Sequence, residues 1–188
     1  MSNNKSSQVN SFYSPEELKN IGLNKYGENV LISRYANFYS PHKITIGDNV
    51  RIDDFCILSG DITLGSHIHI AAYVVLYGGD NEIVLENYTG ISARSTIYST
   101  MDDFSGDYLI GPIHSKEYTN LTGGKVILQS FSQIGANCII FPNITIGRGS
   151  VIGACSLVTK SIDEWGIYIG IPAKKIKDRR KNLLKFFE

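Results

Sequence analysis

Four histidines are the side chains of this sequence that accept and release a proton near neutral pH, as a general base must. His69 stands between two isoleucines, so in an extended chain it points away from the apolar side. His42 lies in a turn, His67 lies at a bend, and His114 lies in a polar loop. We predict that His69 is the catalytic base and that His114 contacts the substrate. A surface histidine without a chemical role is the alternative for each.

Two adjacent carboxylates, Asp102 and Asp103, open the same polar loop. A carboxylate beside an imidazole orients the ring, and a carboxylate also binds the hydroxyl or amine of a substrate. We therefore predict both as catalytic residues, with two solvated loop acids as the alternative. The run from Asp102 to Asp107 partly matches a calcium-binding loop, but its glycine is misplaced and the closing glutamate is missing. We exclude a calcium site here.

An internal repeat with a period of six residues must position these side chains. The residues at the repeated apolar position are Ile46, Ile52, Leu58, Leu64, Ile70 and Leu76, then Leu85, Ile91 and Ile97, and later Leu128, Ile134, Ile140, Ile146, Ile152 and Val158. The pattern predicts short strands with one buried face, joined by bends that tolerate left-handed backbone. Three bends close a coil of roughly 18 residues, and stacked coils form an all-β fold, a parallel β-helix.

Three segments depart from the repeat. Ser14-Pro-Glu-Glu17 predicts a capped helix that ends near Ile21 and covers the open end of the coils. Residues 101–124 lose the pattern, which indicates a functional excursion loop. The end of the chain is basic, and its apolar residues have a spacing that predicts an α-helix. The expected units are a tail with a capping helix (1–29), the β-helix domain (30–170) and a basic C-terminal helix (171–188).

Several phrases of the sequence resemble one family. They are Ile44-Thr-Ile-Gly-Asp-Asn, Ile144-Thr-Ile-Gly-Arg-Gly, and a closing run from Val158-Thr-Lys-Ser to Gly-Ile-Tyr-Ile-Gly-Ile-Pro-Ala-Lys-Lys. With the repeat, they resemble the hexapeptide-repeat acyltransferases, and the closing run resembles the acetyl-CoA-dependent acetyltransferases of galactosides, maltose and nucleotide-linked amino sugars. This resemblance covers residues 30–180 and implies a left-handed β-helix, whereas the general rule for parallel crossovers favours the right hand.

The resemblance also implies a homotrimer with acetyl-CoA in the cleft between neighbouring copies. The residues that it places along the cofactor are Ala136 and Ala154 beside the pantetheine, and Thr159, Lys160 and Lys174 near the nucleotide. Lysines supply point charges for the cofactor's phosphates, and a solvated basic surface is the alternative. Outward aromatic residues favour a trimer as well, and two of them, Tyr77 and Tyr98, are assigned to substrate binding.

The sequence departs from the galactoside and maltose type at one place. Those enzymes carry a catalytic histidine in a Thr-His-Pro segment, where this chain reads Ser99-Thr-Met-Asp-Asp-Phe. The difference favours a base at His69, or else a carboxylate or an unassisted amine. One family with the same repeat is a zinc carbonic anhydrase, whose open catalytic site needs three histidines. Here the bend between His67 and His69 directs the two side chains differently and no His-x4-His pair exists, so we expect no metal.

Composition limits the other classes of function. The formal net charge is zero, which argues against nucleic-acid binding. No apolar run is long enough to insert in a membrane, and the N-terminus lacks the apolar core of a signal peptide. Cys56 and Cys138 stand two residues before a repeat position, where the sequence also places small or apolar residues, and no cysteine pair forms a CxxC motif. This predicts buried free thiols in a reducing cytoplasm.

These observations predict a cytoplasmic homotrimer that moves acetyl from acetyl-CoA directly onto a sugar, without a covalent acyl-enzyme. The resemblance favours the amino group of a nucleotide-linked amino sugar for a surface polysaccharide such as lipopolysaccharide O-antigen or capsule. Transfer to a sugar hydroxyl is the first alternative, because the same base and cleft serve both. A non-catalytic β-helix that acts as an assembly or binding module is the second.

Overall fold

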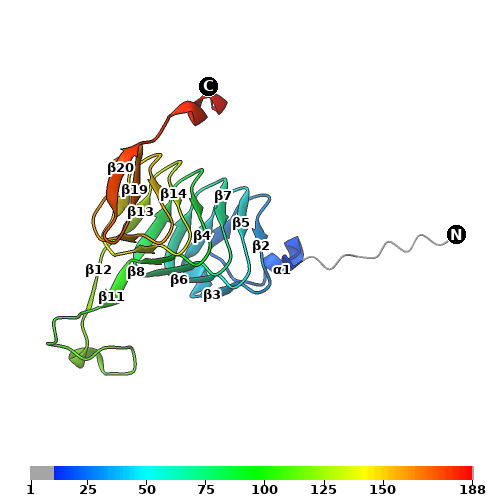
Figure 1. Ribbon diagram of the computed structural model, residues 1–188. Coiled ribbons are helices and arrows are strands. Elements are labelled where there is room, and N and C mark those ends of the chain that lie inside the picture. The colour runs from blue at the N-terminus through cyan, green and yellow to red at the C-terminus, as the bar shows by residue number, and fades with distance from the viewer. Residues whose placement is uncertain (1–10, 188) are drawn as a thin grey trace.

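The computed structural model describes residues 11–187, which form a prism of stacked coils with one arm that leaves its side (Figure 1). The strands of one sheet are β1 (Lys25–Tyr26), β3 (Asn37–Tyr39), β4 (Ile44–Ile46), β6 (Ile57–Leu64), β8 (Val75–Leu85), β10 (Thr96–Tyr98), β13 (Val126–Leu128), β15 (Ile139–Ile140), β16 (Thr145–Ile146) and β18 (Leu157–Val158). This sheet covers two walls of the prism, because β6 pairs with β3 through one half and with β4 through the other.

The third wall is a separate sheet, which we call the His69 wall. Its strands are β2 (Leu31–Ile32), β5 (Val50–Ile52), β7 (Ile68–Ile70), β9 (Gly90–Ile91), β14 (Gln133–Ile134), β17 (Val151–Ile152), β19 (Gly166–Ile169) and β20 (Lys174–Asp178). All neighbours in it are parallel except β19 and β20. This architecture confirms the predicted parallel β-helix and is consistent with the left-handed form that the resemblance implied.

The repeated apolar positions form the core along the axis of the prism. Successive coils bring equivalent positions into register, as Ile46 pairs with Leu64 and Ile52 with Ile70. Every member of the predicted series from Ile46 to Val158 is buried, at 2% exposure or less. Full burial of one such side chain is worth about 1.5–3 kcal/mol relative to exposure, so the three repeat residues of a coil stabilise it together with the equally buried residues two positions before them, such as Ile44, Val50 and Ile62. Cys56 and Cys138 are buried and free, as predicted, and burial raises the pKa of Cys56 to about 11.

The N-terminal end of the prism is closed by helix α1 (Pro15–Leu18). Its capping box is present, because Ser14 and Glu17 exchange side-chain and backbone hydrogen bonds. The helix ends three residues before the predicted Ile21, and Leu18 packs into the end of the core. The first strand, β1, already pairs with β4, so the coils begin before residue 30. A 3-10 helix η1 (Pro41–Lys43) precedes β4.

The sequence predicted an α-helix at the C-terminal end, and this prediction is wrong for the described residues. Strand β20 (Lys174–Asp178) runs antiparallel to β19, and the 3-10 helix η3 (Asn182–Phe186) follows. The physical reason is the edge of the last coil, whose backbone groups need hydrogen-bond partners that a returning strand provides. Beyond it, Phe187 packs edge-on against Tyr88 and Phe131. This apolar residue therefore packs on the side of the prism and is not part of the apolar face of an α-helix.

The excursion that the sequence predicted is an arm of residues 100–124. Strands β11 (Thr100–Asp102) and β12 (Leu121–Gly123) pair antiparallel at its base, and the 3-10 helix η2 (Lys116–Tyr118) lies farther out. Figure 1 shows the arm pointing away from the prism. Within residues 11–187, no helix has the length and apolar character needed to cross a membrane.

Candidate active site

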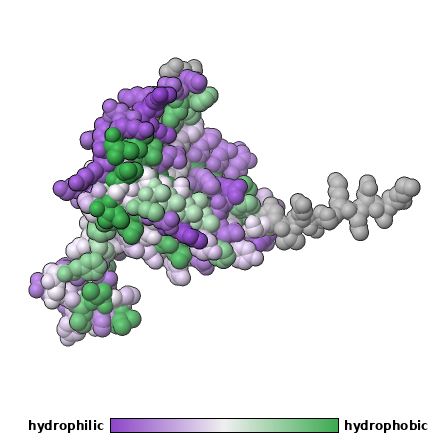
Figure 2. Space-filling view, viewed as in Figure 1, coloured by the Kyte–Doolittle hydropathy of each residue, from purple (hydrophilic) through white to green (hydrophobic). Residues whose placement is uncertain are grey.

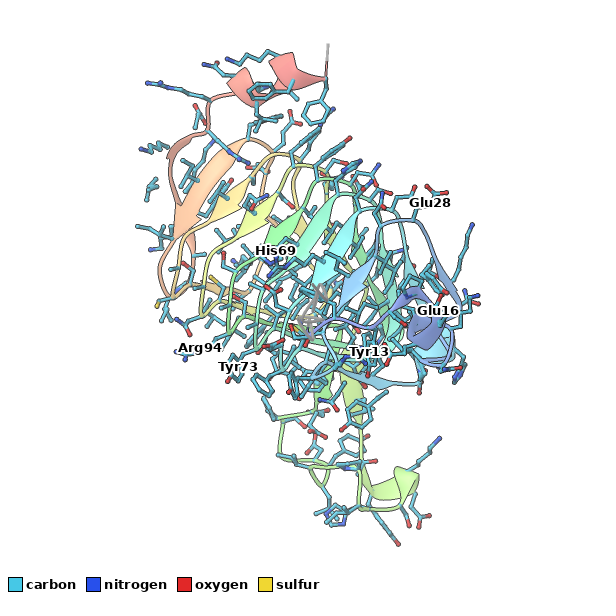
Figure 3. The ribbon with its side chains drawn as sticks, turned by 90° about the vertical axis from the view of Figure 1, so that its right-hand side faces the viewer. Tyr13, Glu16, Glu28, His69, Tyr73 and Arg94 are labelled. Carbon is cyan, nitrogen blue, oxygen red and sulfur yellow. The ribbon has the colours of Figure 1, made fainter. Side chains whose placement is uncertain are left out.

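His69 is the central residue of β7 and points outward from the wall, as predicted, because both flanking isoleucines are buried in the core (Figure 3). Its side chain is 55% exposed. Its Nε2 atom lies 2.7 Å from Oδ2 of Asp53 in the preceding coil. Because strand pairing holds both residues on one surface, this contact fixes the orientation of the imidazole.

Asp53 bridges two basic side chains, since its Oδ1 accepts a hydrogen bond from Nε of Arg51 at 2.7 Å. Partial burial opposes ionisation of Asp53, but the hydrogen bonds from His69 and Arg51 outweigh it and lower the pKa of the carboxyl. An ionised Asp53 accepts the proton of Nε2, so in neutral His69 the Nδ1 atom carries the free lone pair. This arrangement suits a base that receives a proton at Nδ1.

Sequence reasoning missed Asp53, although the repeat contained the signal. Arg51 pairs with His69 in the register of β5 and β7, so the residue two positions after Arg51 lies at the next corner of the same coil. Counting one coil back from His69 would therefore have found this carboxylate. The prediction instead sought it in the arm.

A cavity of about 370 Å³ opens on the His69 wall beside this group. Its lining combines His69 with Gly90, Ser92 and Gln133 from the following coils. The ring of His67 also borders it, stacked on Tyr88 with the ring centroids 4.7 Å apart. Imidazole, hydroxyl and amide groups thus meet around one hollow, which is the composition expected of a small-molecule site.

A second cavity, of about 380 Å³, brings together three residues that the resemblance placed near the nucleotide of the cofactor. Thr159, Lys160 and Lys174 all line it, together with Lys175. Thr159 and Lys160 directly follow β18, and Lys174 begins β20, so the return of the chain after β19 brings these residues together. The three lysines give it a positive charge suited to phosphates.

A column of alanines runs along the corner that follows the His69 wall. Ala136 and Ala154 belong to it, since Cys155 N donates to Ala136 O at 2.8 Å. The column continues through Ala93 and Ala72, each joined to the next coil by a backbone hydrogen bond. Ala93 also lines the first cavity. Sequence reasoning missed these two, although both stand two residues after a repeat position, as Ala136 and Ala154 do.

Tyr77 and Tyr98 lie on a different wall from His69. They occupy β8 and β10 and stack with their ring centroids 5.2 Å apart. Burial raises the pKa of Tyr98. Within one chain, therefore, the structure brings these two tyrosines together but does not bring them to the His69 cavity.

The acidic pair and His114 belong to the arm. Asp102 Oδ1 accepts from Gly111 N at 3.1 Å, and Asp103 accepts from Ser105 N at 2.7 Å and from Asn120 Nδ2 at 2.9 Å. These hydrogen bonds lower the pKa of Asp103, and the hydrogen bond from the backbone of Ser105 has the largest effect. His114 is exposed. Within one chain, Asp53 therefore holds the position beside His69 that the prediction gave to Asp102 or Asp103.

No metal-binding group of three or more His, Cys, Asp or Glu side chains occurs in the part of the chain that the structure describes. The two neighbouring histidines have different partners, since His67 stacks on Tyr88 while His69 bonds to Asp53.

Comparison with known proteins identifies the family. The sequence profile described as "Bacterial transferase hexapeptide (six repeats)" matches residues 43–78. The dTDP-4-amino-4,6-dideoxy-D-glucose acyltransferase of Escherichia coli is 40% identical over 172 residues, which cover 90% of this chain and 89% of that protein.

Solved structures of AntD, an N-acyltransferase from Bacillus cereus, are similar over nearly the whole chain. One complex with dTDP-4-amino-4,6-dideoxyglucose and coenzyme A superposes with a TM-score of 0.92 at 51% identity, covering 95% of this chain and 96% of that chain. Another, with dTDP and 3-hydroxybutyryl-CoA, has a TM-score of 0.92 at 52% identity and covers 95% of each. The chain therefore belongs to the bacterial hexapeptide-repeat sugar acyltransferases.

Proposed function

We propose that this protein transfers an acyl group from a coenzyme A thioester to the amino group of a dTDP-linked 4-amino-4,6-dideoxy sugar. The observation that carries the proposal is the likeness to AntD, at 51–52% identity over 95% of the chain, in complexes that contain the nucleotide sugar or the acyl donor. The two cavities and the alanine column support it, because they supply a polar reaction site, a corner of small side chains beside that site, and a cationic site near the end of the last coil.

In this proposal the acceptor amine, protonated in solution, gives a proton to Nδ1 of His69. The amine nitrogen then attacks the thioester carbonyl carbon, the C–N bond forms and the C–S bond breaks. The nitrogen then loses a second proton, which the departing thiolate takes up, while the first proton passes from His69 to solvent. The products are the amide, coenzyme A and one released proton. Asp53 holds the imidazole in the tautomer that this step needs, and no covalent acyl-enzyme is required.

Ser92 and Asp102 are proposed as further site residues. Solved AntD structures include variants altered at one serine and at one aspartate ten positions further along. This chain contains one serine–aspartate pair at that spacing, Ser92 and Asp102. Ser92 lines the His69 cavity, and Asp102 Oδ1 is held by Gly111 while Oδ2 has no hydrogen bond to the described residues. We assign to Asp102 the charge that attracts the acceptor's ammonium group.

Assembly as a homotrimer would unite these groups, since the arm of one copy would reach the His69 wall of the next. The arm supports this, because it exposes a set of large apolar side chains, Phe104, Tyr108, Leu109, Ile110, Ile113, Tyr118 and Leu121 (Figure 2). The mass of one chain is 20.8 kDa, and light scattering at micromolar concentration should give three times this value. A monomeric mass would contradict this assembly.

The biological setting is proposed from the same chemistry. The product would be an N-acylated nucleotide sugar for a surface polysaccharide, and 25% identity to the putative lipopolysaccharide biosynthesis O-acetyl transferase WbbJ of Escherichia coli supports that direction. Coenzyme A thioesters, nucleotide sugars and free cysteine thiols favour the cytoplasm.

The direct test is turnover of the purified protein with dTDP-4-amino-4,6-dideoxyglucose and either acetyl-CoA or 3-hydroxybutyryl-CoA. Release of the thiol and the mass of the acylated sugar should both appear. The matched control is dTDP-glucose, which lacks the amine and should not react. Acylation of that control, or a product cleaved by mild base, would favour the hydroxyl as acceptor. Absence of turnover with every donor would favour the non-catalytic alternative.

A further inference from the structure

The outward positions of the His69 wall form a column with one gap beside the proposed base. Strand register places the members of this column next to one another in the order Arg51, His69, Gly90, Gln133 and Val151. Gly90 alone in this series has no side chain. The gap therefore lies over Gly90, next to the imidazole of His69, and the amide end of Gln133 reaches into it.

The backbone does not require glycine at this position. Gly90 does not adopt the left-handed conformation, unlike Gly60 with φ +86°. The three atoms nearest to a Cβ on Gly90 would all belong to the amide end of Gln133, with Oε1 at 2.8 Å and Nε2 at 3.3 Å. That side chain is flexible and 133 is an exposed position, so it can move away. By contrast, a Cβ on Gly135 would meet the backbone of Ala154 at 2.6 Å. The missing side chain at Gly90 thus leaves space that only the movable amide end of Gln133 approaches closely.

The gap is part of the reaction site rather than an isolated hollow. Gly90, His69 and Ala93 all line the 370 Å³ cavity, and Ala93 is where the alanine column reaches it. A pantetheine arm along the alanines would present its thioester here, with the acyl chain directed across Gly90.

We infer that the gap over Gly90 receives the acyl chain of the donor and sets the length of chain that the enzyme transfers. This inference rests on the proposed function and adds to it a specificity-determining residue. The lining suits a short hydroxyacyl group, because the methyl groups of Ala71 and Ala93 can meet its carbons while Ser92 and Gln133 offer polar atoms. A four-carbon chain needs the space that one added methyl group at position 90 would occupy.

The test compares Gly90→Ala and Gly90→Val with the unaltered protein, using acetyl-, propionyl-, butyryl- and 3-hydroxybutyryl-CoA. We expect Gly90→Ala to keep kcat/KM for acetyl-CoA within about threefold and to lower it for the four-carbon donors by about 10- to 200-fold, the range for one methylene in a pocket. Gly90→Val should extend the loss to propionyl-CoA. Gln133→Ala is the control for displacement of the amide, and it should not reproduce this dependence on chain length.

Three results would overturn the inference. An equal loss for all donors with a raised KM for the nucleotide sugar would assign the gap to the acceptor. Loss of the oligomer in Gly90→Ala would assign it to a neighbouring copy, and unchanged donor selectivity would leave the gap without a role in selection. Calorimetry with 3-hydroxybutyryl-CoA and acetyl-CoA measures the same selectivity without turnover. It therefore separates failure of this inference from failure of the proposed function.

Discussion

Replacement of Asp53 by asparagine is the sharpest test of the proposed reaction centre. Asparagine keeps the size of the side chain but removes the charge that Nε2 of His69 and Nε of Arg51 both contact at 2.7 Å. When His69 takes the acceptor's proton, the imidazolium forms beside this carboxylate. The variant therefore weakens an interaction that is strongest in the transition state.

The magnitude follows from the two contacts. A hydrogen bond to a charged group is worth about 1.5–3 kcal/mol, and each 1.4 kcal/mol corresponds to a factor of ten. That range corresponds to about 10- to 150-fold in rate. The His69 side chain is 55% exposed while that of Asp53 is 18% exposed, so solvent screens part of the interaction. We expect kcat to fall by about 10- to 50-fold.

The assay is steady-state release of coenzyme A between pH 6 and 9, with circular dichroism to verify the fold. Asp53→Asn should lower kcat, change the pH profile and leave the affinity for coenzyme A unchanged, and Asp53→Glu should restore part of the rate. Asp54→Asn is the matched control, because Asp54 accepts a hydrogen bond from Ser33 and does not contact His69. The reasoning would be refuted if Asp53→Asn kept more than a third of the rate with an unaltered pH profile.

Three further predictions test the base, the cofactor groove and the N-terminal cap. His69→Asn should lose about 100- to 10,000-fold in rate with intact fold and cofactor binding, while His42→Asn stays near wild type; retention of a third of the activity would shift attention to the arm's acidic pair. Ala154→Phe should abolish acetyl-CoA binding in calorimetry without unfolding the protein, because the residue is exposed, and unchanged affinity would remove the pantetheine from this corner. Hydrogen bonds from Arg34 lower the pKa of Glu17 to about 2, so Glu17 contributes stability above pH 4.5 that is lost as the pH falls towards 2. The difference in Tm between wild type and Glu17→Gln should therefore disappear across that interval, and a constant difference would contradict the assignment.

The sequence by itself determined the stacked coils, because the signal for them is local. Each short strand buries its repeat residues whatever coil lies above it, so a period of six in Ile46, Ile52 and Leu58 is sufficient to predict the core. The same holds for the capping box at Ser14, which closes within one turn, and for the arm, whose start and end are where the pattern stops and resumes. The outward direction of His69 follows from alternation alone.

Only the tertiary structure decided which groups meet. Asp53 reaches His69 because two strands pair across a full coil. The carboxylates of the arm stand in the segment that matches Thr-His-Pro of the galactoside- and maltose-type enzymes, but within one chain they bind Gly111 and Asn120 instead. The separation of Tyr77 from His69 depends on which wall each strand occupies. Likewise, the C-terminal segment has helical spacing, but the open edge of β19 converts Lys174–Asp178 into a strand. In each case the deciding partner is distant in the chain, and hydrogen bonds across that distance outweigh the local preference.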